Sequence, residues 1–502
     1  MPSFFPFLPQ AFKSIVKIIL PCISCFNMLR LMLVIRRRRN SCFKHEVWMM
    51  KSSKYNFFVH YEQDNAYIGY NGVSGGLYVF NPQQYQEAIS ILSGEKSDNY
   101  SSNVRHTLLN GRFIIPDDTN EINILKLRNN FSRFNSIDIS LVIAPTLACN
   151  FDCPYCYVDR EKSIMSGDTV EALKKFFVSK LDKATKADIV WTGGEPLLAV
   201  NIIEELNLFF EKKAKDKSVP FSSRLISNGF LLKPPMLDRM KKANIKWFQI
   251  TLDGSRDFHN SLRYTKGKGQ TFDTILENVV YATNNDFFVV LRSNITKENY
   301  SGVYQLIDDL VDSGVNLSNC LFVPCMVTKS NEANRSCTCD VFSNQEFSAI
   351  ESEIISYSLK RGFRFVDSTL KATRVFCGAN TLQLHVIDSH ANILKCWCNL
   401  GNSEKNKVGM IDNNGNYHIT NHNTLSNWMA ADPFSNEACL NCKVLPLCLG
   451  GCIYYQVMDQ MESFENGCSH LKYNIENILR LLYSNKIKSI KQENKNQEAQ
   501  NG

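Results

Sequence analysis

Three cysteines occur within eight residues of this chain, Cys149, Cys153 and Cys156, in the spacing C-x3-C-x2-C. They follow the apolar run of residues 137–145 (IDISLVIAP), which is typical of a buried β-strand. Such a short loop can hold three corners of one [4Fe–4S] cluster, which normally takes four thiolates. One iron then keeps an open coordination position, as the metal does in catalytic zinc sites with three protein ligands. The triplet alone also admits a zinc site or three incidental thiols.

The triplet, with the aromatic Tyr155 before its third cysteine, resembles the signature of the radical S-adenosylmethionine (SAM) enzymes. The resemblance implies that the open iron chelates the amino and carboxylate groups of SAM. It also implies that a 5′-deoxyadenosyl radical then removes a hydrogen atom from the substrate. On this basis Cys149, Cys153 and Cys156 are the catalytic cluster ligands, and Tyr155 is a cofactor-binding residue.

Strands and helices alternate over residues 137–327, which favours parallel strands joined by right-handed crossovers. The helices between strands include residues 167–183 and 202–214, and the strands are expected at residues 137–145, 188–192, 222–227, 247–252, 287–295 and 320–325. Six such units match the incomplete (β/α)6 barrel of the radical SAM family. The expected fold class is therefore α/β, with chemistry at the carboxyl ends of the strands.

Polar and glycine-rich motifs follow several of these strands. The second strand leads into Gly193, Gly194, Glu195 and Pro196, which resemble the GGEP motif of the same family. Two glycines let the backbone approach a ligand closely, and Glu195 offers acceptors to a bound ammonium. The other cofactor-binding residues that the resemblance implies are Asn228, Thr251, Asp253, Arg292 and Asn294. The alternative for Asn228 and Asp253 is a structural turn, because each precedes a glycine. Asp253 and His259 are candidates for a catalytic base, and the sequence singles out neither of them.

A second cysteine array, C-x2-C-x5-C-x3-C, spans residues 439–452, and further cysteines lie before and after it. This order resembles the SPASM domain, which carries auxiliary [4Fe–4S] clusters. By resemblance, the outer cluster is ligated by Cys439, Cys442, Cys448 and Cys468, and the inner one by Cys377, Cys396 and Cys452. The fourth inner position is either open to substrate or filled by a thiolate from Cys398, Cys320, Cys325, Cys337 or Cys339. Ala391 stands where the family pattern has a glycine, and zinc is the structural alternative.

The front of the chain divides into two parts. Residues 1–48 are apolar but interrupted by proline and charge, and no window of about 20 residues is free of both, as a spanning helix needs. This segment is expected to be peripheral or upstream of the functional start, although the RRRR at residues 36–39 also fits a cytoplasmic anchor. Residues 51–133 predict a small α+β domain. It resembles the leader-peptide-binding module of peptide-modifying radical SAM enzymes, and a plain capping domain is the alternative.

Four further segments are expected after the small α+β domain. The radical SAM partial barrel spans residues 137–327, a linker region 328–370, a SPASM domain 371–471, and a helix with a disordered tail 472–502. The net charge of +7 reflects basic segments near both ends, so no nucleic-acid partner is expected. Clustered cysteines, 18 in all, without a convincing signal sequence favour metal clusters in a reducing cytoplasm and an anaerobic host. Membrane association stays an alternative that rests on the RRRR segment.

The function expected from these motifs is the radical-based modification of a peptide or protein, such as a thioether or carbon–carbon cross-link. The cofactors are SAM, one radical SAM [4Fe–4S] cluster and two auxiliary clusters, with flavodoxin or ferredoxin as electron donor. The first alternative is a formylglycine-forming enzyme similar to anaerobic sulfatase maturases. Trp397 counts against it, because those enzymes are expected to carry an acidic residue after the cysteine equivalent to Cys396. The second alternative is a non-catalytic iron–sulfur or zinc protein for binding or electron transfer.

Overall fold

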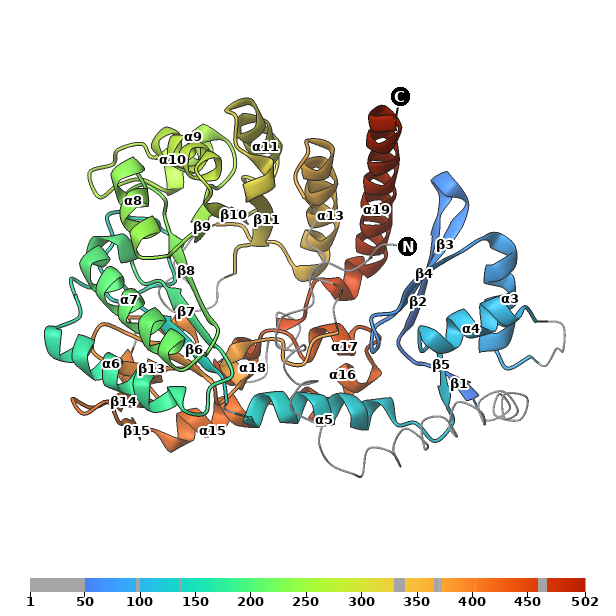
Figure 1. The fold of residues 1–502 in the computed structure, drawn as a ribbon, viewed down its shortest axis with the longest axis horizontal. Helices are drawn as coiled ribbons and strands as arrows, with labels where there is room; N and C mark the ends of the chain where they lie inside the picture. Colours follow the sequence, from blue (N-terminus) through green and yellow to red (C-terminus); the bar gives the residue numbers. More distant parts are fainter. Residues whose placement is uncertain are drawn as a thin grey trace.

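The computed structural model describes residues 50–95, 100–135, 137–328, 339–364, 370, 372–401, 403–458 and 467–501, without the side chains of 403 and 487–501. The expectations for residues 1–48 and for Cys337 lie outside these ranges. A small N-terminal module lies at one end of the molecule and a large sheet with its helices at the other (Figure 1). The cysteine-bearing helices α16 (Glu437–Asn441) and α17 (Leu445–Cys448) lie between them.

The N-terminal module contains a three-stranded antiparallel sheet in the order β2-β3-β4. Its elements are β2 (Asn56–Tyr61), β3 (Ala66–Asn71), β4 (Leu77–Phe80), α3 (Pro82–Leu92) and α4 (Ser102–Asn110), and β1 (Met50–Ser52) pairs with β5 (Ile114–Pro116). Strands β3 and β4 form a hairpin across the turn that follows Asn71. Asn81 and Gln84 form both halves of a capping box, which fixes the start of α3.

Helix α5 (Glu121–Phe134) connects this module to the rest of the chain (Figure 1). Asn129 Nδ2 donates to the carbonyl oxygen of Arg374 at 2.8 Å. The buried Arg133 donates from Nε to the carbonyl oxygen of Asn380 at 3.3 Å. These bonds attach the helix to the backbone of the cysteine-rich region.

Six parallel strands form the centre of the large sheet, close to the bounds that the sequence predicted. They are β6 (Ile139–Ile143), β7 (Ala187–Trp191), β8 (Phe221–Ser227), β9 (Trp247–Thr251), β10 (Phe288–Ile295) and β11 (Cys320–Met326), paired in that order. The helices between them are α6 (Gly167–Leu181), α7 (Val200–Asp216), α8 (Pro234–Lys242), α9 (Arg256–Leu262), α10 (Phe272–Asn284) and α11 (Gly302–Asp312). The arrangement is the expected α/β fold with a partial barrel, because β6 and β11 do not pair with each other.

The cysteine-rich region extends this sheet, which the sequence did not predict. Strand β12 (Leu384–Ile387) pairs in parallel with β6, and β13 (Asn392–Leu394), β14 (Gly409–Ile411) and β15 (Tyr417–Ile419) continue the sheet antiparallel. Ala391, between β12 and β13, has a φ of 64°. The turn therefore keeps the left-handed conformation that a glycine adopts more cheaply.

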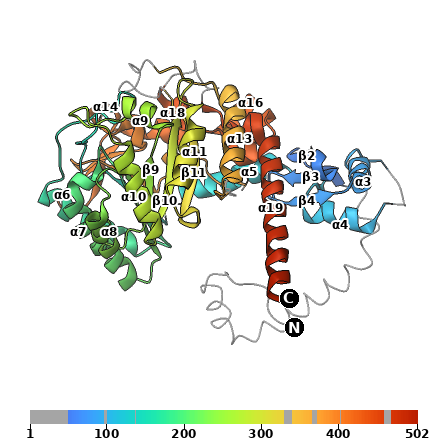
Figure 2. The same ribbon diagram turned by 90° about the horizontal axis from the view of Figure 1, so that it is seen from above.

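The remaining helices are α13 (Asn344–Lys360), α14 (Ser403–Asn406), α15 (His422–Ala430), α18 (Ile453–Met458) and α19 (Leu471–Asn501). Helix α19 packs against α13 and β2 and extends away from the body of the molecule (Figure 2). The sequence predicted a disordered tail after residue 485, whereas the described backbone is helical to residue 501. Lys, Glu and Gln are good helix formers, and no glycine or proline interrupts this segment.

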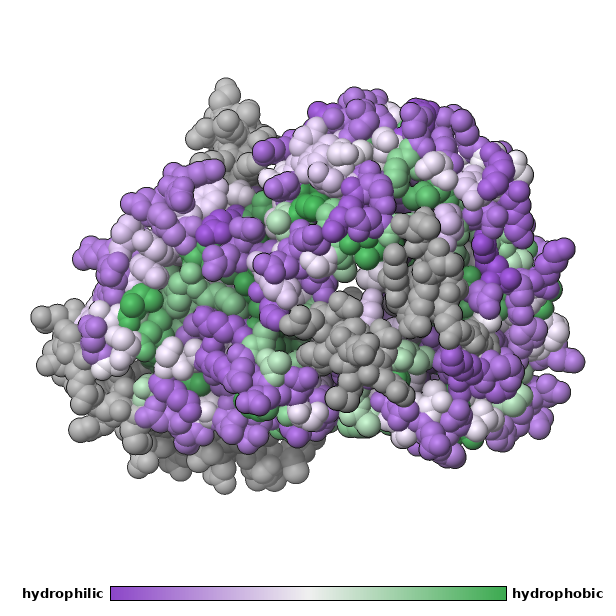
Figure 3. Space-filling model, turned by 180° about the vertical axis from the view of Figure 1, so that it is seen from behind, coloured by the Kyte–Doolittle hydropathy of each residue, from purple (hydrophilic) through white to green (hydrophobic). Residues whose placement is uncertain are grey.

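The surface is largely polar, with scattered apolar residues. On the face opposite to that of Figure 1, hydrophilic side chains cover most of the periphery (Figure 3). Within the part of the chain that the structure describes, no helix has both the length and the apolar character that crossing a bilayer requires.

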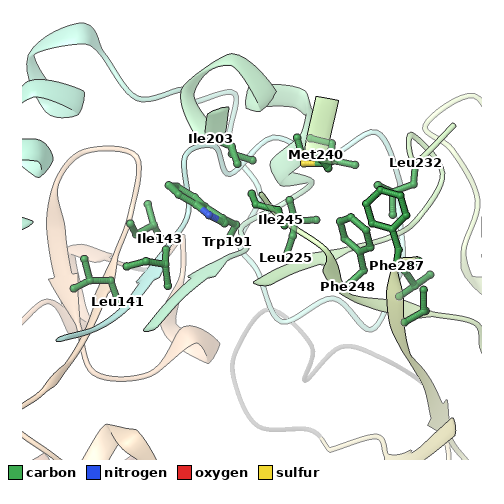
Figure 4. Close-up of a cluster of buried hydrophobic side chains, with 14 of the residues drawn as sticks. Leu141, Ile143, Trp191, Ile203, Leu225, Leu232, Met240, Ile245, Phe248 and Phe287 are labelled. Carbon is green, nitrogen blue, oxygen red and sulfur yellow. The ribbon is translucent and has the colours of Figure 1, made fainter. Parts of the chain in front are cut away.

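The main core lies between the parallel strands and their helices, where Trp191 packs with Ile203, Leu225 and Ile245 (Figure 4). Trp191 is fully buried, and its Nε1 donates to Asn207 Oδ1 at 3.0 Å. Asn207, on α7, in turn donates from Nδ2 to the carbonyl oxygen of Ala243 at 2.7 Å. The side-chain amide of Asn207 thus satisfies the indole N–H of Trp191 and the carbonyl group of Ala243, which lie on separate segments.

We expect Asn207→Ala to lower the free energy of unfolding by about 1–3 kcal/mol, because it leaves the buried carbonyl of Ala243 without its donor. Urea unfolding followed by circular dichroism measures this change. Lys212→Ala, a substitution at an exposed position of the same helix, is the matched control and should stay within about 0.5 kcal/mol of the parent. Equal midpoints for both variants would contradict the role given to Asn207.

Candidate functional site

The cysteine triplet lies on the loop that follows β6. Cys153 is buried, and Cys149 and Cys156 are partly exposed. The backbone N–H of Cys156 donates to the carbonyl oxygen of Cys153 at 3.3 Å, which closes a tight turn. Residues 150–152 hydrogen-bond through their backbones to residues 264–266, which follow α9. The loop is therefore held in place by the segment after the fourth strand of the barrel.

The surroundings of the three thiols fit the ligands of an iron–sulfur cluster. Burial raises the pKa of all three, to about 11 for Cys149 and Cys153. A backbone N–H two residues further along the chain donates to Cys149 and to Cys156, and the guanidinium of Arg263 lowers the pKa of all three thiols. Amide donors and one cation thus stabilise thiolates that burial disfavours. A bound metal cluster would supply the rest of the positive charge.

Gly193 and Gly194 follow β7 and touch the segment that leads to Cys149. A Cβ on Gly193 would lie 2.2 Å from the carbonyl oxygen of Thr146, and one on Gly194 would lie 2.2 Å from that of Ala148. Gly194 N–H donates to the carbonyl oxygen of Thr146 at 3.1 Å. The glycines are therefore required for a close approach to the protein's own backbone. Their approach to a ligand stays a prediction.

Glu195 is fully buried and links the ends of β7 and β8. Its Oε1 accepts the Ser227 hydroxyl at 2.9 Å, and its Oε2 accepts the Asn228 N–H at 2.8 Å. Burial raises the pKa of this carboxyl to about 7, against the effect of these hydrogen bonds. Both oxygens thus already have donors within the protein, and the expected contact with a bound ammonium stays a prediction. Pro196 is buried and begins a 3-10 helix, Pro196–Ala199.

Asn228 lies next to the triplet. Its Nδ2 donates to Asn150 Oδ1 at 2.8 Å and lies 4.0 Å from Cys149 Sγ. Thr251, another predicted cofactor residue, is buried at the end of β9 and is aligned with Arg292 of β10. The structure therefore brings predicted residues from three strands to the same end of the sheet as the cysteine loop.

A buried polar cluster joins the triplet to the end of β9. Asp253 is fully buried, and its Oδ2 accepts the hydroxyl of Tyr155. Arg263 Nη1 donates to that hydroxyl at 2.7 Å and lies 3.7 Å from Asp253 Oδ2. The spacing of the sequence gave no sign of this contact. The cluster positions Tyr155 within the loop and pairs the buried charges.

His259 does not serve as a catalytic base in this arrangement. Its Nδ1 accepts the backbone N–H of Asp253 at 3.2 Å, and its Nε2 lies 3.0 Å from the Thr271 hydroxyl. Burial holds its pKa well below the usual range. Both ring nitrogens are occupied inside the fold, so the side chain positions Asp253 and is not available as a base.

Arg292 and Asn294 lie on one face of β10, as the alternation of strand residues predicted. Arg292 Nε donates to Asn294 Oδ1 at 2.8 Å, and the Asn294 N–H donates to Asp253 Oδ1 at 2.7 Å. Cys325 of β11 and Tyr157, next to the triplet, raise the pKa of Arg292 against the opposing effect of burial. The guanidinium therefore stands between the cysteine loop and the last strand of the barrel.

The four cysteines assigned to the outer cluster lie together. Cys439 interacts electrostatically with Cys442, Cys448 and Cys468, and Cys448 also interacts with the other two. Burial raises the pKa of Cys439 to about 12 and that of Cys448 to about 11. Backbone N–H groups of Ser469 and Gly450 donate to the Cys448 sulfur. Backbone N–H groups thus donate to a buried cysteine sulfur here, as they do at the triplet.

The cysteines assigned to the inner cluster also lie together, and a fourth cysteine joins them. Cys396 neighbours Cys377, and Cys452 neighbours Cys377. Cys398 interacts with each of these three. Among the described residues, no three His, Cys, Asp or Glu side chains converge as ligands of a single metal ion. Thiolates of a [4Fe–4S] cluster bind separate iron atoms and do not need to meet at one centre.

Residues 143–310 match the family model of the Radical SAM superfamily. An AdoMet-dependent heme synthase from Methanosarcina barkeri is 23% identical over 155 residues, which are 31% of this chain and 42% of that protein. The matches to the first three curated relatives span only 42%, 59% and 40% of their lengths. These similarities cover about a third of this chain.

Two further matches extend beyond this region. A cysteine-type anaerobic sulfatase-maturating enzyme from Clostridium novyi is 22% identical over 391 residues, which are 70% of this chain and 99% of that protein. The structure of native anSMEcpe with bound AdoMet and Cp18Cys peptide superposes with a TM-score of 0.53 and 19% identity. It covers 69% of this chain and 96% of that chain. This likeness shows a shared fold.

We expect Gly194→Ala to reduce iron binding by the triplet by about four atoms per chain, because a methyl group there displaces the carbonyl groups of residues 147 and 148. Iron and sulfide analysis of anaerobically purified protein measures the loss. Gly167→Ala is the control, since a Cβ there meets no atom within 4 Å. Full iron content in the Gly194 variant would refute the packing described above.

Proposed function

We propose that this chain is a radical SAM enzyme that modifies a peptide or protein substrate, because residues 143–310 match the family model of the Radical SAM superfamily. One observation carries the proposal: the three-thiol loop lies at the same end of the sheet as the predicted cofactor residues of four neighbouring strands. A [4Fe–4S] cluster and SAM, when bound there, supply a 5′-deoxyadenosyl radical. Cys149, Cys153 and Cys156 would hold the cluster.

The residues around the triplet have distinct proposed roles toward the cofactor. The loop of residues 193–196 and Asn228 would bind the methionine end of SAM beside the cluster, since Asn228 lies next to Cys149. Arg292 and Asn294, both on β10, would bind its carboxylate and ribose hydroxyls through a cation and an amide. Tyr155, Arg263 and Asp253 hold one another and would fix this side of the loop beside the cofactor.

Two kinds of support favour a peptide or protein as substrate. The maturase from Clostridium novyi aligns over nearly its whole length, and the anSMEcpe structure contains a peptide. The N-terminal module offers strand β4 at the edge of its sheet, whereas the other edge, β2, packs against α19. An extended peptide can add to such an edge through main-chain hydrogen bonds. In this proposal residues 51–133 capture a leader segment.

A second candidate function is formylglycine formation, which the Clostridium novyi alignment favours. Trp397 after Cys396 counts against it. Neither candidate base supports it, because Asp253 has both oxygens hydrogen-bonded and His259 is buried. In either case the electron donor would be a flavodoxin or a ferredoxin. The two C-terminal cysteine groups would each hold an auxiliary cluster.

The combined variant Cys149→Ala, Cys153→Ala and Cys156→Ala should form no 5′-deoxyadenosine from SAM under reducing conditions. It should keep about eight of about twelve iron atoms per chain, because the C-terminal groups retain their thiols. Chromatography of the nucleoside and iron analysis test this expectation. Cys320→Ala, a buried cysteine at the start of β11, is the control and should behave like the parent. Deoxyadenosine formation by the triple variant would disprove the assignment.

Mass spectrometry of the product distinguishes the two candidate functions. A peptide encoded by a short reading frame beside this gene should lose two hydrogen atoms on forming a cross-link. A cysteine-containing sulfatase peptide should instead exchange its thiol for an aldehyde that reacts with a hydrazide. We expect the first result and no aldehyde. Aldehyde formation without any cross-link would favour the maturase alternative.

A further inference from the structure

We infer that Cys398 supplies the fourth thiolate of the inner cysteine group, so that Cys377, Cys396, Cys398 and Cys452 form a complete four-thiolate site. This inference rests on the proposed auxiliary cluster in that region. The spacing of the chain left the fourth position open between a substrate and five different cysteines. Four of these five cysteines lie in the part of the chain that the structure describes, and their positions distinguish them.

The turn between Cys396 and Cys398 brings their two thiols together. Cys396 precedes the 3-10 helix Trp397–Asn399, and the Asn399 N–H donates to the Cys396 carbonyl oxygen at 3.2 Å. The two thiols hydrogen-bond to each other, and the Cys398 N–H also donates to the Cys396 sulfur. Both cysteines pack against the core, whereas Trp397 between them is 41% exposed. The C-x-C turn therefore turns its two sulfurs inward and its indole outward.

The other two members approach Cys398 from separate segments. Cys377 precedes a similar 3-10 helix, Gly378–Asn380, and its sulfur accepts the N–H of Ala379. Cys452 lies just before α18, and its sulfur accepts N–H groups from Tyr454 and Tyr455. Each of these sulfurs therefore sits at the start of a helical turn with amide donors pointing at it. Hydrogen bonds to the sulfurs are among the features that tune iron–sulfur clusters.

The competing cysteines lie elsewhere. Cys320 begins β11 and is buried at the opposite end of that strand from the triplet. Cys325, on the same strand, faces Arg292, Glu351 and Asp253. Cys339 is bonded in a disulfide. Within the described residues, Cys398 is thus the only one of these candidates that neighbours all three predicted inner ligands.

The position of Cys398 also determines what the inner site offers to a substrate. Cys398 interacts with Tyr157 and Arg292, the two residues that lie between the inner group and the triplet. A protein thiolate therefore occupies the side of the group that faces the barrel. With four protein thiolates, a cluster there keeps no open iron, and a substrate thiol cannot bind to it.

The test uses the full chain in the background of the triple variant at positions 149, 153 and 156, so that only C-terminal clusters contribute. The variants are Cys398→Ala, Cys398→Ser and the control Cys320→Ala. Each is purified without oxygen and analysed for iron and sulfide. The reduced clusters are then studied by electron paramagnetic resonance with and without isotopically labelled imidazole, whose nitrogen couples magnetically to an iron that it binds.

The parent background and Cys320→Ala should hold about eight iron atoms per chain and show no imidazole coupling. Cys398→Ala should either lose about four iron atoms or keep them and show imidazole coupling, since one iron lacks its thiolate. Cys398→Ser should keep its iron with a shifted spectrum, because oxygen replaces sulfur. Imidazole coupling in the parent, or a Cys398→Ala variant identical to it, would overturn the inference.

Failure of the proposed function would give different results for deoxyadenosine formation and for iron content. Deoxyadenosine formation by the chain with an intact triplet tests radical SAM chemistry independently of Cys398. A triple-variant background without iron or sulfide would refute the auxiliary clusters and the ligand role of Cys398 together. The same background with its iron present but open to imidazole would refute only the role of Cys398.

Discussion

The close approach of two backbone segments fixes the geometry of the whole site. Gly193 and Gly194 leave no room for a side chain against the carbonyl groups of residues 146 and 148, which lead directly into the cysteine triplet. The buried carboxylate of Glu195 then accepts donors from the next loop, at Ser227 and Asn228. Three successive strand ends are thereby joined without any bound group. The positions of the thiols thus follow from backbone packing.

Buried polar groups continue this network on the other side of the triplet. Arg263, Tyr155 and Asp253 contact one another, and His259 holds the backbone of Asp253. Burying a charge is costly unless it is paired and hydrogen-bonded, so removing one partner leaves the others unsatisfied. Asp253 also accepts the backbone N–H of Asn294, which connects this cluster to β10. These side chains therefore define the walls of the site.

Strand β12 explains how the cysteine groups come near the triplet. It pairs in parallel with β6, whose end carries the loop with Cys149, and β13 ends two residues before Cys396. One strand pairing thus brings together segments that lie far apart in the sequence. The interaction of Tyr157 with Cys398 follows from it. The C-terminal region is therefore continuous with the sheet that carries the triplet.

The resemblance to a family grouped the outer four cysteines, whereas six parallel strands and the cysteine triplet could be predicted from the sequence pattern. The strands and the triplet depend on apolar runs and on short spacings, which act within a few residues of each other. The folded structure was needed to reveal the pairing of β12 with β6, the contacts of Arg263, the burial of His259 and the position of Cys398. Each depends on segments far apart in the chain, whose meeting is set by packing and by hydrogen bonds that no local spacing encodes.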